Sequence, residues 1–114
     1  MSHSSRAALF ALGGLALAFS ALRPPPAAAA FIATERLLRA CSASDARSTA
    51  DCTGYIVGVA DAAQLRRGEV CVPAGVSVRG LREAVLGELR RHPGESDAAA
   101  AVMAALRTLY PCPR

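Results

Sequence analysis

Apolar side chains recur at helical spacing in four segments of the chain after residue 30. No segment alternates apolar and polar residues over six positions, so the pattern gives almost no strand signal. The four predicted helices run from about residue 33 to 41, from 51 to 65, from 77 to 92 and from 96 to 109. Residues 42–50, between the first two helices, are rich in Ser, Asp and Thr and are expected to be irregular.

One side of each predicted helix is apolar and is expected to face the core. The expected inward residues are Leu37, Leu38 and Cys41; Tyr55, Ile56, Val59 and Ala63; Val78, Leu81, Val85 and Leu89; and Ala98, Val102, Leu109 and either Ala105 or Leu106. Thr34, Asp51, Ser77 and Ser96 stand at the predicted helix starts, where a side-chain oxygen can accept a hydrogen bond from a free backbone N–H group. Proline follows the last two helices and disfavours helical backbone in the residue before it.

Four short helices with brief connections predict an all-α fold, a small antiparallel helical bundle. Residues 31–114 suffice for one domain, and no repeat or long linker divides them. Domains of this size have small cores and are often reinforced by covalent links. We therefore expect one helical domain that uses its cysteines for support.

Residues 1–30 have the three parts of a cleavable secretory signal peptide. Arg6 precedes an apolar stretch without charges, residues 7–22, which is followed by a proline triplet and a run of alanines. The small side chains up to Ala30 predict cleavage before Phe31. The alternative is a retained anchor, but the stretch is shorter than the roughly 20 apolar residues that a membrane span needs. We expect an exported protein that meets the membrane only during export.

All four cysteines follow the expected cleavage site, which favours two disulfides in an exported domain. Zinc is the competing use, but there is no C-x2–4-C pair and His92 is the only histidine after residue 30. Cys41 ends the first predicted helix and Cys52 begins the second, while Cys71 precedes the third and Cys112 follows the fourth. The start of one antiparallel helix lies beside the end of the next. We therefore expect the pairs Cys41–Cys52 and Cys71–Cys112 rather than the other two connectivities.

The remaining side chains do not form a recognisable catalytic, cofactor or nucleic-acid motif. Lys and Arg together number 13 against 9 Asp and Glu, and no basic run is interleaved with aromatics. His92 stands beside Pro93 at a helix end, and no free thiolate is expected to pair with it. No Gly-rich phosphate loop and no nucleophile elbow occurs. We expect a binding protein without a cofactor or metal, and not an enzyme.

Gly54, Gly58 and Ala62 are spaced four residues apart in the second predicted helix. A glycine inside a helix costs about 1 kcal/mol relative to alanine, so two of them imply that another backbone approaches this face, which also holds Tyr55. Two interpretations stay open. The face packs against another helix of the same bundle, or it packs against a second subunit.

Four blocks of the chain, each with one cysteine, fit short motifs in order. Residues 37–41 (LLRAC) fit L-L-x-x-C, and residues 52–61 (CTGYIVGVAD) fit C-x-G-Y-I-x-G-x-x-D. Residues 71–77 (CVPAGVS) fit C-x-P-x-G-V-[ST], and residues 105–112 (ALRTLYPC) fit A-L-x-x-x-[FY]-P-C. With these motifs the chain resembles the Rap/Tai family of type VI secretion immunity proteins over nearly all of residues 31–114.

The resemblance implies a periplasmic, all-helical binding protein, usually a homodimer. Members of the family dock onto a peptidoglycan amidase effector and block its cleft. The matching positions are mainly cysteines, glycines and apolar residues, so the motifs transfer the fold and no effector-binding residue. The alternative function is a non-catalytic helical module of the cell envelope, structural or interacting, with no toxin partner.

The connection between the second and third predicted helices, residues 64–70, is the expected docking site for a partner. Connections carry binding function more often than helix faces, because the scaffold holds them while their sequence is free to vary. Arg66 and Arg67 offer guanidinium groups that suit carboxylates and backbone carbonyls, and Glu69 follows shortly before Cys71. The alternative is an ordinary solvated loop.

Overall fold

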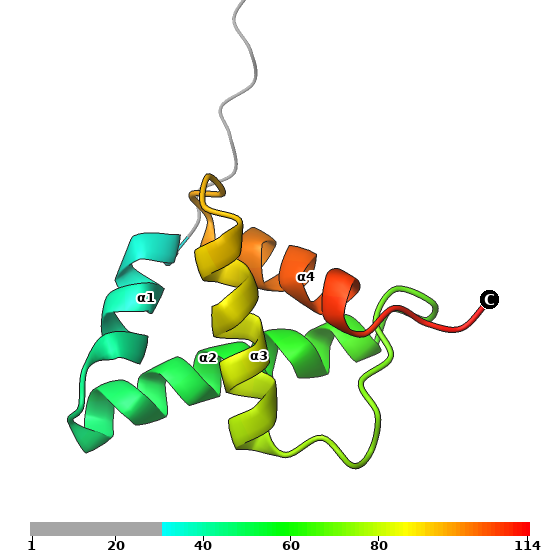
Figure 1. Cartoon of the computed structure of the whole chain (residues 1–114), viewed down its shortest axis with the longest axis horizontal. Coiled ribbons are helices and arrows are strands. Elements are labelled where there is room, and N and C mark those ends of the chain that lie inside the picture. Colours follow the sequence, from blue (N-terminus) through cyan, green and yellow to red (C-terminus); the bar gives the residue numbers. More distant parts are fainter. Residues whose placement is uncertain (1–30) are drawn as a thin grey trace, which may run out of the picture.

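The computed structural model describes residues 31–114, and the expected signal peptide lies outside the described residues. The described chain folds into helices α1 (Thr34–Ser42), α2 (Ala46–Gln64), α3 (Val78–Arg91) and α4 (Ala98–Leu109). Helix α2 contacts each of the other three, and α3 crosses it in Figure 1. The predicted all-α bundle is confirmed. No helix within this part of the chain is long and apolar enough to cross a membrane.

The core lies where α2, α3 and α4 meet. Its fully buried side chains include Ile56, Val85, Val102 and Leu106, and α1 contributes Leu37. Most of the expected inward residues are buried or half-buried, the half-buried ones being Leu38, Cys41, Tyr55, Val59 and Leu109. Val78, at the first position of α3, is an exception, since 54% of it is exposed.

Helix α2 begins earlier than its apolar pattern predicts. Asp45 is its N-cap, and the Asp45 side chain accepts a hydrogen bond from the amide of Ser48 (2.9 Å). The Thr49 hydroxyl donates to the Asp45 carbonyl (3.0 Å), so polar residues of the expected loop complete the first helical turn. The prediction of an irregular segment over residues 42–50 therefore holds only for residues 43–45, which lie between the two helices. The predicted cap at Asp51 is wrong, because Asp51 lies inside α2.

The predicted caps at Thr34 and Ser96 are also wrong, because both residues join distant segments. The Thr34 amide donates to the carbonyl of Ser96 (2.8 Å), and the Thr34 hydroxyl donates to the carbonyl of Glu95 (2.7 Å). The two helices have Ala33 and Asp97 as N-caps, and these two residues pair in an isolated antiparallel bridge. These contacts fix the start of α1 to the turn between α3 and α4.

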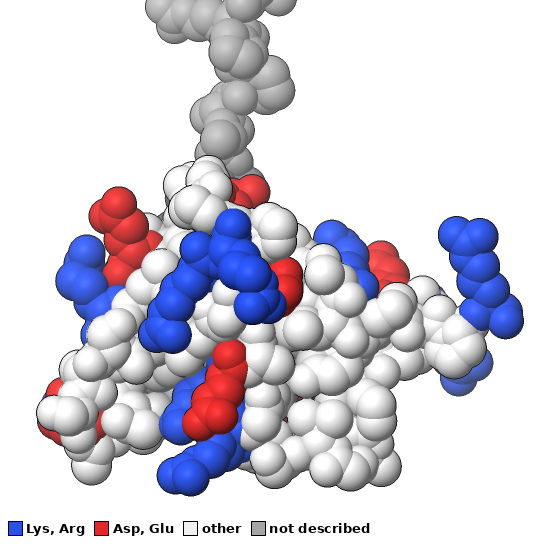
Figure 2. All heavy atoms as spheres, in the orientation of Figure 1, with Lys and Arg blue, Asp and Glu red and all other residues white. Residues whose placement is uncertain are grey.

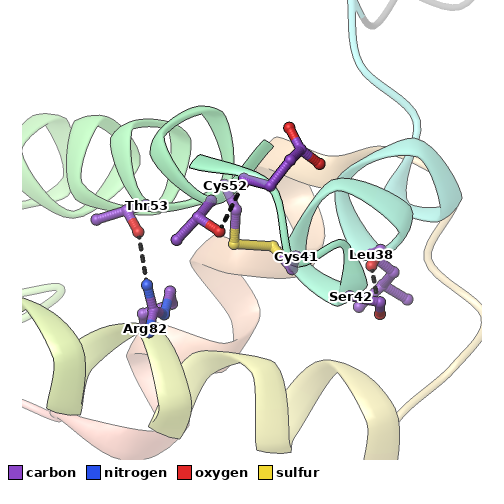
Figure 3. The surroundings of a disulfide bond; sticks show 8 residues. Leu38, Cys41, Ser42, Cys52, Thr53 and Arg82 are labelled. Atoms are coloured by element: carbon purple, nitrogen blue, oxygen red, sulfur yellow. Dashed lines mark hydrogen bonds between the residues drawn. A yellow bond between two sulfur atoms is a disulfide. The ribbon is translucent and has the colours of Figure 1, made fainter. Parts of the chain in front are cut away.

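Helix α3 follows its sequence signals closely. The Ser77 hydroxyl accepts a hydrogen bond from the amide of Gly80 (3.0 Å), which confirms the predicted cap. The helix ends at His92, the C-cap, as expected from the proline that follows. Arg82 donates from Nη1 to the hydroxyl of Thr53 (3.0 Å), and this bond joins α3 to α2 beside the first disulfide (Figure 3).

Two disulfides connect the helices in the expected pairs. Cys41 at the end of α1 is bonded to Cys52 in α2 (Figure 3). Cys71, before α3, is bonded to Cys112, after α4. The Cys71 amide also donates to the carbonyl of Tyr110 (2.9 Å), so the C-terminal segment is attached to the α2–α3 connection by a covalent and a hydrogen bond.

Candidate interaction surface

One side of α2 exposes its small residues. Gly54, Gly58 and Ala62 are all exposed. Apart from the adjoining backbone of α2 and the neighbouring residues in the chain, a methyl group added at either glycine would meet no atom within 4 Å. No close approach of another backbone inside the bundle therefore accounts for these glycines. Contact with a second subunit, the other interpretation of this face, stays a proposal.

Two shallow hollows flank this face and meet at Gly54 and Tyr55. The first, of about 470 Å³, lies between α2 and α4 and extends to Arg66 and Met103. The second, of about 400 Å³, lies between α1 and α2 and extends to Asp51. Together they form a groove along α2 with mainly apolar walls, with Arg36 and Asp51 near one end and Arg66 near the other. We call it the α2 groove.

Tyr55 occupies the middle of the α2 groove. Its side chain is half-buried, and burial raises the pKa of its hydroxyl, with a further contribution from the negative charge of Asp97. Tyrosine is common at binding hot spots, because its ring supplies apolar area while its hydroxyl can form a hydrogen bond. Tyr55 therefore places an apolar ring and a polar hydroxyl at the point where the two hollows meet.

The connection after α2 presents an exposed tip. Leu65 is 85% exposed, and Arg66 and Arg67 are exposed as well. Glu69 differs, because its Oε2 lies 3.2 Å from Nη2 of Arg107 on α4. The structure thus keeps the two expected arginines at the surface, while the third expected partner-binding residue, Glu69, forms an ion pair within the chain.

This tip is held at its C-terminal end. Gly68 adopts a positive φ of 88°, a conformation that glycine tolerates at little cost. Val70 is buried, and the disulfide at Cys71 follows directly. A side chain on such a connection loses less freedom on binding than one on a loose loop. The sequence could not reveal the exposure of Leu65, which depends on where the end of α2 lies.

His92, the only histidine of the described residues, lies beside the carboxylate of Glu88. Glu88 is largely buried, and its carboxylate contacts Arg91 through one oxygen and lies 3.5 Å from Nε2 of His92 through the other. The His92 side chain is 74% exposed. Arg91 therefore supplies a positive charge beside the buried carboxylate of Glu88 near the end of α3. Neither residue beside His92 in this arrangement is a nucleophile that a general base could activate.

The described residues show no metal cluster. No group of three or more His, Cys, Asp and Glu in residues 31–114 could hold a metal ion. All four cysteines are in disulfides. On the face shown in Figure 2, basic and acidic side chains are interspersed.

Comparison with known proteins identifies the fold. The family model of the Rap1a immunity proteins matches residues 33–112, which include all four helices and both disulfides. Searches among curated proteins and among solved structures gave no match. Because the family model covers most of the chain, this protein belongs to the Rap1a immunity protein family.

Proposed function

We propose that this protein is a periplasmic immunity protein, which binds a peptidoglycan amidase effector of type VI secretion and inhibits it. The observation that carries the proposal is the match to the Rap1a immunity family over residues 33–112. Immunity proteins act on effectors, and the motifs over residues 37–112 resemble those of chains that neutralise amidases. The expected mode of action is stoichiometric binding without catalysis.

The periplasmic location is supported by the disulfides and by the expected signal peptide. Disulfides persist in oxidising compartments such as the bacterial periplasm and are rare in the cytosol. Peptidoglycan, the substrate of the proposed target, is exposed in the same compartment. An inhibitor placed there meets an incoming amidase before the cell wall is cut.

The exposed tip after α2 is the proposed effector contact. Leu65 supplies an apolar side chain beside the guanidinium groups of Arg66 and Arg67, and such a combination suits the partly apolar, hydrogen-bonding interior of a protein interface. Glu69 takes a supporting role, since its ion pair with Arg107 holds the connection on α4. A complete interface buries roughly 1,200–2,000 Å² in total, so the tip would form only its centre.

The family resemblance also implies a homodimer, and we propose that two copies associate. The α2 groove is the surface proposed for this contact, through Gly54, Tyr55, Gly58 and Ala62. The proposal is separate from the effector proposal, because a monomer could still bind an amidase through its tip.

Protection of cells tests the proposed function. The amidase used is one encoded beside this gene, or a cognate one identified by capture on the immobilised protein. Cells direct this amidase to their periplasm, either with or without expression of this chain. We expect lysis without the chain and normal growth with it, and no protection from a chain that lacks residues 1–30 and stays in the cytosol. Capture of resident envelope proteins alone, together with lysis in both strains, would contradict the proposal and favour the envelope module.

A further inference from the structure

We infer that the exposed tip after α2 is a cleavage site for an envelope endoprotease that recognises arginine, and that a cut beside Arg67 ends inhibition of the effector. The inference rests on the function proposed above for its consequence, the loss of inhibition. The site itself rests on the exposure of the tip, on its two arginines and on the placement of the disulfides.

The first observation concerns the positions of the arginines. Among the arginines with described residues on both sides, only Arg66 and Arg67 lie outside the helices. Both are exposed, together with the residues on either side of the pair. The other adjacent pair of arginines, Arg90 and Arg91, is exposed as well but belongs to α3. Exposed loop tips are preferred sites of proteolytic cleavage, so the first pair is favoured over the second.

The second observation is that the tip can open at small cost. An endoprotease acts on an extended chain, so cleavage follows the population of the open form when opening is fast. The Arg66 amide donates to the carbonyl of Ala63 (3.1 Å), and the Glu69 amide donates to the carbonyl of Arg66 over 3.4 Å, which is long for such a bond. None of residues 64–69 is buried. Opening this segment therefore exposes little apolar surface, while the disulfide at Cys71 stays in place.

The chemistry of the tip suits a protease whose specificity pocket carries a carboxylate. A guanidinium group forms two parallel hydrogen bonds with a carboxylate, and neither Arg66 nor Arg67 is in an ion pair within residues 31–114. Hydrolysis breaks the C–N bond that follows the arginine held in the pocket. Water supplies a hydroxyl group to the carbonyl carbon and a hydrogen to the nitrogen, which leaves as an amine. The reaction therefore needs no oxidant, reductant or cofactor.

The placement of the disulfides means that a cut at the tip divides the domain. The bond Cys41–Cys52 joins α1 to α2, and the bond Cys71–Cys112 joins the segment before α3 to the segment after α4. Neither disulfide links the chain before Arg67 to the chain after it. One fragment therefore holds α1 and α2 and the other holds α3 and α4, with no covalent bond between them.

The core needs both fragments. Ile56 of α2 belongs to one buried cluster with Val85 of α3 and with Val102 and Leu106 of α4. A short connection keeps two such parts at an effective concentration in the millimolar range, and a cut removes this advantage. At micromolar concentration we therefore expect the fragments to separate, to lose helix and to stop inhibiting the effector.

Limited digestion of the oxidised mature protein with trypsin tests the site. The sequence contains no lysine, so trypsin cuts it only after arginine. We expect the first cut beside Arg67, giving two fragments that separate on a denaturing gel without reduction. Arg66→Gln with Arg67→Gln should leave the chain intact over the time in which the wild type is fully cut. The matched variant Arg79→Gln with Arg90→Gln, which changes two exposed arginines of α3, should be cut like the wild type.

Incubation with an envelope extract of the producing cells tests the protease and the consequence of the cut. The wild-type protein is incubated with and without benzamidine, which competes for pockets that bind arginine. We expect a cut beside Arg67 that benzamidine blocks, followed by loss of helical content in circular dichroism and of amidase inhibition.

Three results would overturn the inference: a first cut within a helix, an intact chain in the extract, or full amidase inhibition by the cut protein. An uncut protein that does not inhibit the cognate amidase would instead remove the proposed function, while the mapped cut would still decide the cleavage site.

Discussion

The carboxylate of Glu69 and the guanidinium of Arg107 form an ion pair, 3.2 Å from Oε2 to Nη2, between the α2–α3 connection and α4. The two residues are 38 positions apart in sequence. The pair lies beside the buried Val70 and the disulfide of Cys71, so one side of the connection is fixed to the bundle. Arg67, which is exposed, therefore belongs to a connection that the ion pair, Val70 and the disulfide hold against the bundle.

Reversing the charges of the tip should weaken effector binding. We expect Arg66→Glu with Arg67→Glu to raise the Kd for the cognate amidase at least about tenfold, equivalent to 1.4 kcal/mol, because guanidinium hydrogen bonds are lost and the charge changes sign. Calorimetric titration measures the affinity, and circular dichroism checks that helical content is unchanged. Arg39→Glu with Arg114→Glu makes the same change of net charge elsewhere and should bind normally.

Arg66 also borders the α2 groove, so the single variant Arg67→Glu separates the two surfaces. It should lower the amidase affinity and leave the self-association of the protein unchanged. Wild-type affinity in the double variant would exclude the tip as an effector contact, while the immunity function would remain intact.

Each disulfide should contribute strongly to stability. By loop-closure entropy, a bridge across 11 residues is worth about 3 kcal/mol and one across 41 residues about 4 kcal/mol. We therefore expect the paired Cys71→Ser and Cys112→Ser variant to lose more free energy of unfolding in urea than the variant with Cys41→Ser and Cys52→Ser. Mass mapping without reduction should give the same pairs, and a link from Cys52 to Cys71 would contradict the structure.

Two leucines give a matched test of the core. Leu106 is fully buried and Leu65 is 85% exposed. Leu106→Ala should reduce the free energy of unfolding by about 2–5 kcal/mol, because it removes apolar contacts and leaves a cavity. Leu65→Ala should change it by less than about 0.5 kcal/mol. Equal losses in urea unfolding would mean that the end of α2 is packed differently.

The Asp45 cap should make stability depend on pH in the acid range. The hydrogen bond from the Ser48 amide lowers the pKa of Asp45 below its ordinary value of 3.8. Its stabilisation is therefore fully present above the unfolded-state pKa and is lost as the pH falls through the lower folded-state pKa. The melting temperatures of the wild type and of Asp45→Ala should differ at neutral pH and converge in strong acid. A constant difference would exclude the carboxylate as the cap.

The sequence predicted features that depend on local chemistry better than those that depend on distant contacts. Ser77 was a correct cap because it precedes a clear apolar row. Asp45 was missed because the first turn of α2 is polar and carries no apolar periodicity. Thr34 was misassigned because its hydroxyl meets Glu95, 61 residues away, and no local signal indicates such a contact. The disulfide pairs were predictable since they follow from helix order.

The interaction surface was predictable only in part for the same reason. The spacing of Gly54 and Gly58 indicated a close contact, but only the structure shows that both lie open at the surface. Glu69 was expected to contact a partner because it lies in the same connection as Arg66 and Arg67. Its ion pair with Arg107 depends on how α4 packs, which the sequence does not show. The exposure of Leu65 likewise depends on how the chain leaves α2.

Titration of the cognate amidase with the oxidised mature protein tests the central claim most directly. The measured quantity is the rate at which purified peptidoglycan releases new amino groups as the ratio of immunity protein to enzyme rises. The account predicts a linear fall of this rate to zero near an equimolar ratio of chains, with no turnover by the immunity protein alone. Full amidase activity at a large excess of the protein would contradict it.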